Sequence, residues 1–164
     1  MANADFRDQT QISCSEGETV RLGEEFGREF LREGVVVTLS GELGAGKTHF
    51  IKGVARALGI DEREITSPTF TLVNEYEIQP LTRLLPLKGR GELQTLYHLD
   101  CYRFEKAEDL LELGVEDYLY PKHAATIIEW PERIAALIPQ DAIKIEIIVV
   151  SENERKIVIQ NLPA

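Results

Sequence analysis

The feature that most constrains the fold of this chain is a glycine-rich segment, GELGAGKTHF, which begins at Gly41. It matches the pattern G-x-x-x-x-G-K-[ST] at Gly41, Gly46, Lys47 and Thr48, with a third glycine at Gly44. Glycines let the backbone turn so that successive N–H groups point at phosphate oxygens, and a helix that starts near Lys47 adds the positive end of its dipole. Lys47 is expected to reach the β- and γ-phosphates of a nucleotide, and the Thr48 hydroxyl is expected to bind Mg²⁺. The segment therefore predicts a phosphate-binding loop.

The residues on either side of the loop have the patterns that this motif requires. Residues 35–39, VVVTL, are apolar and mostly β-branched without alternation, which favours a strand covered on both faces of a parallel sheet. After the loop, apolar residues keep helical spacing until Gly59. Upstream, SEGE at residues 15–18 is typical of a capping box, which predicts a helix from there to about Arg32. Gly34 is expected to end that helix in a left-handed cap.

The rest of the chain alternates short strand and helix patterns. Strands are expected at residues 71–77, 95–100 and 124–130. A helix broken near Gly114 is expected over residues 107–119, and residues 143–159 alternate as an antiparallel hairpin. Together these patterns predict a single α/β domain over residues 1–164: a three-layer P-loop NTPase-like domain with a mainly parallel central sheet and a C-terminal antiparallel hairpin. Residues 78–94, with two prolines and two glycines, are interpreted as an insertion or hairpin loop.

Two acidic residues close apolar strand patterns, where a Mg²⁺ ligand is expected. Asp100 ends TLYHLD, and Glu129 ends ATIIE. Because the carboxyl ends of parallel strands share one edge of a sheet, both should lie beside the loop that follows Leu39. One carboxylate would hold the water shell of Mg²⁺ while the other orients or deprotonates the attacking water. The alternative is that either acid simply caps an exposed strand end.

Two further features near the expected site have two interpretations each. The hydroxyls of TSPTFT at residues 66–71, Ser67 and Thr69 among them, would sense a γ-phosphate and Mg²⁺, or they belong to a Ser-Pro turn. Trp130, the only tryptophan, would stack on a base or a partner, or it is a half-buried core residue.

Composition disfavours several classes of function. The chain has 18 basic and 28 acidic residues, a net charge of -10 that repels phosphate backbones, so a partner protein is expected to handle any RNA. No apolar run approaches the ~20 residues that span a membrane, and the N-terminus lacks the pattern of a signal peptide, so a cytoplasmic location is expected. Cys14 and Cys101 are expected to be reduced thiols. His49 and His98 have no second histidine or cysteine at metal-ligand spacing and are interpreted as structural.

Several longer segments resemble one family. GELGAGKTHF, SPTFTLVNEYE, YHLDCYRF, ELGVEDYL and IEWPERI, in this order, are similar to the TsaE (YjeE) family of bacterial ATPases required for threonylcarbamoyladenosine modification of tRNA. The resemblance runs over residues 22–139. It implies a compact P-loop domain that binds ATP with Mg²⁺, hydrolyses it slowly, and works with the TsaB and TsaD proteins. TsaD is the transferase that carries threonylcarbamoyl to adenosine, so tRNA would be contacted indirectly, through the complex.

The resemblance also assigns roles to residues of this chain. The family's loop corresponds to residues 41–48, its switch segment to residues 67–71, its HLD aspartate to Asp100, and its EW pair to Glu129 and Trp130. The residues expected to act in catalysis are Lys47, Asp100 and Glu129. The residues expected to bind the metal are Thr48, Asp100 and Glu129. The residues expected to contact the nucleotide are Gly41, Glu42, Leu43, Gly44, Ala45, Gly46, Lys47, Thr48, His49, Ser67, Thr69 and Trp130.

The chain departs from the family pattern at two places. His49 stands where the family has threonine or serine, and residues 78–94 are longer than the family's connection. Three functions fit these observations. The first is a regulatory ATPase that resets the TsaB and TsaD machinery between rounds of tRNA modification. The second is a small-molecule kinase with residues 78–94 as a basic lid carrying Arg83, Lys88 and Arg90. The third is an assembly factor for which ATP binding matters and hydrolysis does not.

Overall fold

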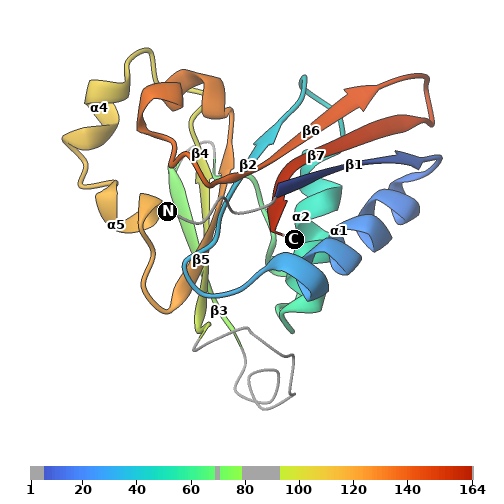
Figure 1. The fold of residues 1–164 in the computed structure, drawn as a ribbon, viewed down its shortest axis with the longest axis horizontal. Coiled ribbons are helices and arrows are strands. Elements are labelled where there is room, and N and C mark those ends of the chain that lie inside the picture. The colour runs from blue at the N-terminus through green and yellow to red at the C-terminus, as the bar shows by residue number, and fades with distance from the viewer. Residues whose placement is uncertain (1–5, 69–70, 79–92, 164) are drawn as a thin grey trace.

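The computed structural model describes residues 6–68, 71–78 and 93–163, and these residues form a seven-stranded sheet flanked by helices (Figure 1). The sheet has the strand order β1-β7-β6-β2-β5-β4-β3. The strands are β1 (Phe6–Ser13), β2 (Val36–Ser40), β3 (Val73–Glu77), β4 (Thr95–Asp100), β5 (Ala124–Glu129), β6 (Ile143–Val149) and β7 (Arg155–Pro163). The predicted strands of residues 35–39, 71–77, 95–100 and 124–130 are therefore confirmed, with small shifts at their ends.

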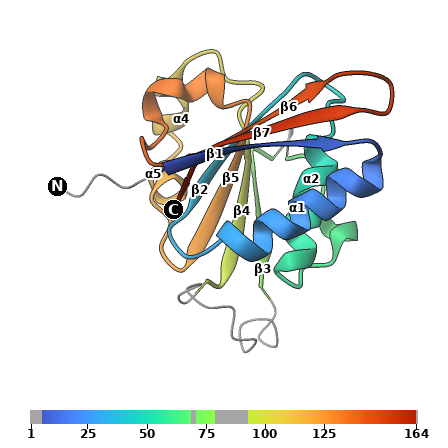
Figure 2. The same ribbon diagram turned by 45° about the vertical axis from the view of Figure 1, so that its right-hand side comes forward.

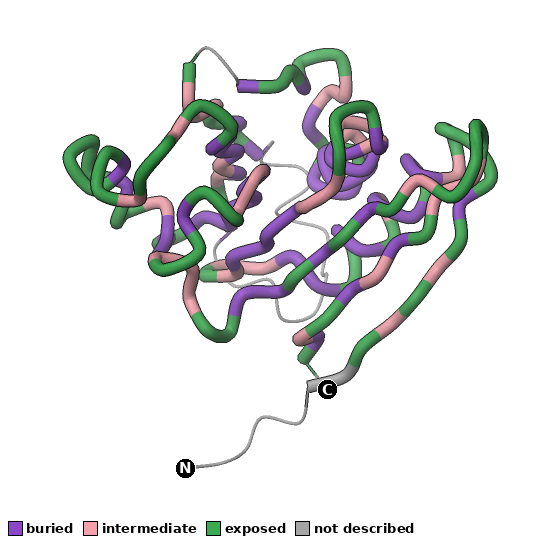
Figure 3. Tube along the Cα trace, turned by 90° about the horizontal axis from the view of Figure 1, so that it is seen from above, coloured by how far each residue is buried: buried purple, intermediate pink, exposed green. Residues whose placement is uncertain are grey.

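The expectation of a mainly parallel sheet is wrong, because the sheet is mixed. Strand β2 pairs in parallel with β5 and β6, and β4 pairs in parallel with β5. The pairs β1 with β7, β6 with β7, and β3 with β4 are antiparallel. The antiparallel pairs extend a parallel centre at both edges, and β1 was not predicted. The C-terminal hairpin, β6 with β7, is confirmed, and its alternation of buried and exposed residues is visible in Figure 3.

Helices cover both faces of the sheet (Figures 1 and 2). On one face lie α1 (Glu16–Phe30) and α2 (Lys47–Ala57), with the short η1 (Glu62–Glu64) after α2. On the other face lie α4 (Ala107–Leu111), α5 (Glu116–Leu119) and η2 (Pro131–Leu137). Each face has its own hydrophobic core, the first including Phe26, Phe50 and Ile127, and the second including Leu110 and Ile128. The three-layer arrangement is thus present, and no helix among the described residues is long and apolar enough to cross a membrane.

The helix boundaries follow from local chemistry. Ser15 caps α1, because its Oγ accepts a hydrogen bond from the Glu18 amide at 3.1 Å, and the Glu18 carboxylate reaches back to the Cys14 amide at 2.6 Å. The prediction for the other end of α1 is wrong. The helix stops at Phe30 because the next residue, Leu31, turns extended and becomes buried, so Gly34 serves the later turn into β2 with φ of +81°.

The break predicted near Gly114 is confirmed. Gly114 has φ of +72° and separates α4 from α5. Of the predicted insertion at residues 78–94, residues 79–92 lie outside the described part of the chain. At its ends, the Ile78 N–H donates to the Gln94 carbonyl oxygen at 2.8 Å, so the two ends are adjacent.

The close crossing of α1 and α2 fixes the position of α2, the helix that follows the glycine loop. At Gly53 on α2, an added Cβ would lie 2.6 Å from the Glu24 amide nitrogen of α1 and nearer still to the Val20 carbonyl oxygen. Gly23 on α1 approaches the Phe50 backbone in the same way. Only glycine permits this approach, so α2 is anchored on α1 directly behind the loop.

Candidate functional site

The register of the parallel strands brings the predicted site residues to one edge of the sheet. Leu39, at the end of β2 before the loop, is the register partner of Glu129 on β5, and Glu129 is the register partner of Asp100 on β4. The two acids therefore lie on neighbouring strands beside the loop, as predicted. Both are buried, with exposed fractions of 5% for Asp100 and 4% for Glu129, so neither is merely an exposed strand end.

The glycine loop between β2 and α2 has a backbone that side chains would disfavour. Gly44 and Gly46 have φ of +78° and +107°, and Gly46 is the N-cap residue directly before α2. At Gly41, φ is +149° and an added Cβ would lie 2.6 Å from the Ile147 carbonyl oxygen of β6. The loop thus follows a strand and opens a helix, which is the context that the motif requires.

Lys47 folds back over its own loop. Its Nζ donates to the Gly41 carbonyl oxygen at 2.7 Å and to the Glu42 carbonyl oxygen at 3.1 Å. The same ammonium lies 4.4 Å from the centre of the Trp130 ring, within the range of a cation–π interaction. Burial lowers the pKa of Lys47 below its usual value, and the nearby carboxylates of Glu129 and Asp100 oppose that shift.

Asp100 is held by hydrogen bonds to both of its carboxylate oxygens. The Ser67 hydroxyl donates to Oδ2 at 2.9 Å, and the Tyr102 amide donates to Oδ1 at 2.9 Å. Ser67 belongs to the hydroxyl-rich segment singled out in the sequence, so that segment meets one of the two acids. Thr69, also expected at the site, lies outside the described residues.

Glu129 is hydrogen-bonded to His98, a residue whose spacing in the sequence indicates only a structural role. His98 Nε2 lies 2.7 Å from Glu129 Oε1. The side chains of both residues are almost wholly buried. The contact joins β4 to β5 on the face of the sheet that α2 covers.

Trp130 takes a backbone conformation that is uncommon for a bulky residue. Its φ of +56° and ψ of +49° lie in the left-handed region, between the last residue of β5 and Pro131 at the start of η2. The ring is half-buried and lies 4.9 Å from the Tyr102 ring, centre to centre. The strained turn therefore places the Trp130 ring, with Tyr102 beside it, next to the Lys47 ammonium.

These residues enclose a cavity of about 420 Å³, within the range of small-molecule sites. The cavity is lined by residues 43–49 together with Ser67, Asp100, Tyr102, Glu129 and Trp130. It therefore brings together all the described site residues that the sequence predicted except Gly41 and Glu42, whose carbonyls instead accept from Lys47. Within the described residues, no three His, Cys, Asp or Glu side chains form a metal-binding group. Thr48, Asp100 and Glu129 offer hard oxygen ligands, which suit Mg²⁺ when phosphate oxygens complete its coordination.

Three residues at or behind the site were missed from the sequence. Tyr102 and His98 lie within the quoted segment YHLDCYRF, but their spacing does not reveal a ring contact or a bond to a neighbouring strand. Arg155, at the start of β7, donates from Nε to the Ala45 carbonyl oxygen at 3.0 Å and from Nη1 to three carbonyls of the β6–β7 turn. No sequence pattern predicts that contact.

Comparisons with known proteins identify the family of this chain. A family model described as "Threonylcarbamoyl adenosine biosynthesis protein TsaE" matches residues 13–157. The chain is 41% identical to a tRNA threonylcarbamoyladenosine biosynthesis protein TsaE of Treponema pallidum, over 90% of this chain and 97% of the relative. It is 38% identical to the protein of the same description from Bacillus subtilis, over 78% of this chain and 70% of the relative. The crystal structure of Bacillus subtilis YdiB superposes with a TM-score of 0.70 at 29% identity, over 96% of this chain and 88% of that one. The chain therefore belongs to the TsaE family.

Proposed function

We propose that this protein binds ATP with Mg²⁺ in the cavity at the carboxyl ends of β2, β4 and β5 and hydrolyses it slowly, in support of threonylcarbamoyladenosine modification of tRNA. The observation that carries the proposal is the convergence of the glycine loop, Lys47, Asp100 and Glu129 on one cavity. A glycine loop between a buried strand and a helix supports a P-loop NTPase fold.

The loop would bind the phosphates through its backbone. Successive N–H groups and the N-terminus of α2 stabilise negative charge, and the Lys47 ammonium would leave the carbonyls of Gly41 and Glu42 to bind phosphate oxygens. Trp130 and Tyr102 would form the apolar wall of the site next to the nucleotide. Leu43, Gly44 and Ala45, within the loop, line the cavity.

The acids would serve hydrolysis. Thr48 and Asp100 would hold Mg²⁺, which when bound neutralises charge on the phosphate oxygens. Glu129 would orient the attacking water and accept its proton. The water oxygen forms a bond to the γ-phosphorus while the bond from that phosphorus to the β,γ-bridging oxygen breaks, so ADP and inorganic phosphate leave. Ser67, bonded to Asp100, would link this site to the hydroxyl-rich segment.

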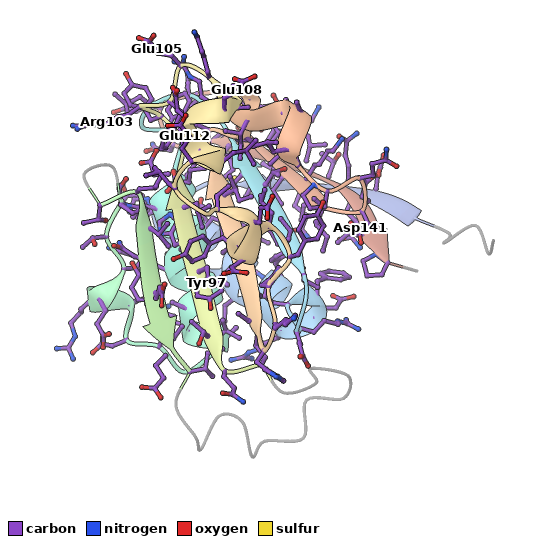
Figure 4. All side chains as sticks on the ribbon, turned by 90° about the vertical axis from the view of Figure 1, so that its left-hand side faces the viewer. Tyr97, Arg103, Glu105, Glu108, Glu112 and Asp141 are labelled. Atoms are coloured by element: carbon purple, nitrogen blue, oxygen red, sulfur yellow. The ribbon has the colours of Figure 1, made fainter. Side chains whose placement is uncertain are left out.

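The surface charge supports the proposal that partner proteins, and not this protein, contact tRNA. The net charge is -10, and the exposed carboxylates Glu105, Glu108 and Glu112 lie on α4 and next to its two ends (Figure 4). Such a surface repels the phosphates of tRNA. We therefore propose that the protein acts in the cytoplasm on TsaB and TsaD, and that these partners contact tRNA.

A single-turnover assay with enzyme in excess over γ-labelled ATP tests the proposal. The wild-type protein should release inorganic phosphate, and Lys47→Ala should lose ATP binding, whereas Lys156→Ala, an exposed lysine on β7, should behave as wild type. Reconstitution with TsaB, TsaD and tRNA should give several rounds of modification only when Lys47 is present.

Two outcomes would favour other functions. Phosphate transfer to a metabolite at kinase rates of ~1–100 s⁻¹ would replace this proposal with the kinase, whose expected basic lid lies mostly outside the described residues. Full support of tRNA modification by Glu129→Gln, with ATP bound and no phosphate released, would favour the assembly factor.

A further inference from the structure

We infer that His98 is a positioning residue for Glu129, holding one carboxylate oxygen so that the other serves the reaction in the cavity. The inference rests on the proposed function, since it concerns the hydrolytic role of Glu129. His98 does not line the cavity and would act only through Glu129.

The contact follows from the sheet register. His98 on β4 is the register partner of Ile127 on β5, so Glu129, two residues further along β5, is its diagonal neighbour on the same face. The distance of 2.7 Å between His98 Nε2 and Glu129 Oε1 is that of a strong hydrogen bond to a charged acceptor. Among the described residues, His98 makes the only hydrogen bond to the Glu129 side chain.

The other ring nitrogen indicates that the imidazole is retained for this bond. His98 Nδ1 is buried and has no hydrogen-bond partner among the described residues. A buried polar atom without a partner costs about 1–3 kcal/mol, and an apolar residue of similar shape would avoid this cost. Stability alone therefore does not explain a histidine here. The tautomer with its proton on Nε2 donates to the carboxylate and leaves Nδ1 as a bare acceptor.

The two acids of the site are thus held differently. Asp100 has hydrogen bonds at both oxygens, from Ser67 and Tyr102, which fit a carboxylate that must stay in place beside a metal. Glu129 lines the cavity and, among the described residues, has a side-chain hydrogen bond at Oε1 alone, from His98. Partners of metal-binding side chains orient those side chains, and their loss lowers activity by about 10- to 100-fold; we expect a loss of the same order for the partner of Glu129.

The test compares two substitutions of His98 whose side chains differ in length. The amide of His98→Gln can place an N–H donor near the position of Nε2, whereas the shorter amide of His98→Asn ends near the position of Nδ1. We expect His98→Asn to lower the single-turnover rate about 10- to 100-fold while ATP affinity stays unchanged, and His98→Gln to recover most of the rate. His123→Asn, at an exposed histidine in the turn before β5, is the matched control and should keep the wild-type rate.

A double-mutant cycle separates positioning from general loss of structure. In a Glu129→Gln background, His98→Asn should cause no further loss of rate, because its effect passes through Glu129. Nitrogen-15 NMR of the imidazole supplies a readout apart from activity. The wild type should show a proton on Nε2 and none on Nδ1, and the Nε2 signal should move in Glu129→Gln.

Three results would overturn the inference. The first is a wild-type rate in His98→Asn while Glu129→Gln is inactive, which leaves the proposed function intact. The second is a folded, ATP-binding His98→Gln as inactive as Glu129→Gln, a result that remains decisive even if His98→Asn fails to fold. The third is a ring with its proton on Nδ1. Undiminished hydrolysis by Glu129→Gln would instead refute the proposed role of Glu129 itself.

Discussion

Replacing Gly53 with alanine tests whether the contact between α1 and α2 holds the loop in place. The added methyl group would lie 2.6 Å from the Glu24 amide nitrogen and nearer still to the Val20 carbonyl oxygen. Both are backbone atoms inside a helix, so neither can rotate away as a side chain would. The two helices must move apart, by about 1 Å or more, to restore an ordinary contact.

The change in the free energy of unfolding caused by Gly53→Ala is the difference between a gain in helix propensity and a cost of overpacking. Alanine stabilises a helix interior by about 1 kcal/mol relative to glycine. Overpacking a tight core costs about 1–3 kcal/mol, and a clash with backbone belongs at the upper end of that range. Gly53→Ala should therefore lower the free energy of unfolding by about 2 kcal/mol, which for a chain of this size is a fall in Tm of about 4–8 °C.

Thermal and urea unfolding measure this change, and Gly17→Ala is the matched control. Gly17 lies in the first turn of α1, where an added Cβ would have no neighbour closer than Ser15 Oγ at 4.0 Å, so the control should keep or slightly gain stability. Because α2 begins at Lys47, Gly53→Ala should also weaken ATP binding. A Gly53→Ala protein as stable as the Gly17→Ala protein would refute the close crossing of the helices.

Three more outcomes are expected. Arg155→Ala should raise the Kd for ATP about 5-fold, measured by calorimetry, because the loop loses the hydrogen bond to Ala45. The emission of Trp130, the only tryptophan, should change when ATP and Mg²⁺ are added, because Lys47 leaves the face of the ring, and the apo emission should differ in Lys47→Ala. With an aromatic disulfide reagent at pH 8, the folded protein should show one reactive thiol, Cys14, because burial raises the pKa of Cys101 to about 12; unfolding should expose the second.

Local patterns in the sequence predicted the parts of the fold that depend on neighbouring residues. The capping box at Ser15, the buried strand before the loop and the helix break at Gly114 each arise within a few residues, and each is present. Strand β1 was missed because it is largely polar and is held by β7, which follows more than a hundred residues later. The antiparallel direction of β3 against β4 was also missed, because the residue pattern of a strand does not encode the direction of its neighbour.

The site residues likewise fall into those that local patterns predict and those that depend on distant contacts. The loop residues were predicted because their pattern is continuous in the chain, and the two acids were predicted because parallel strands end at a common edge. The bond from His98 to Glu129 joins residues 31 positions apart, and the bond from Arg155 to Ala45 joins residues 110 positions apart. Such contacts depend on register and hairpin geometry, which residue spacing does not encode.

The groups that would bind phosphate and the acids that would serve hydrolysis come from different parts of the chain. The phosphate-binding groups lie on one continuous segment, from the end of β2 to the start of α2, and their geometry depends on glycines and on the helix N-terminus. Glu129 and Asp100 come from β5 and β4, and each is oriented by partners that do not belong to the loop. Substitutions at His98 or Glu129 should therefore change the rate of phosphate release without changing ATP affinity, whereas substitutions at Lys47 should remove both. Because the two sets of groups meet only at the cavity, a partner protein that displaces the β4 or β5 end would alter hydrolysis while the nucleotide stays bound.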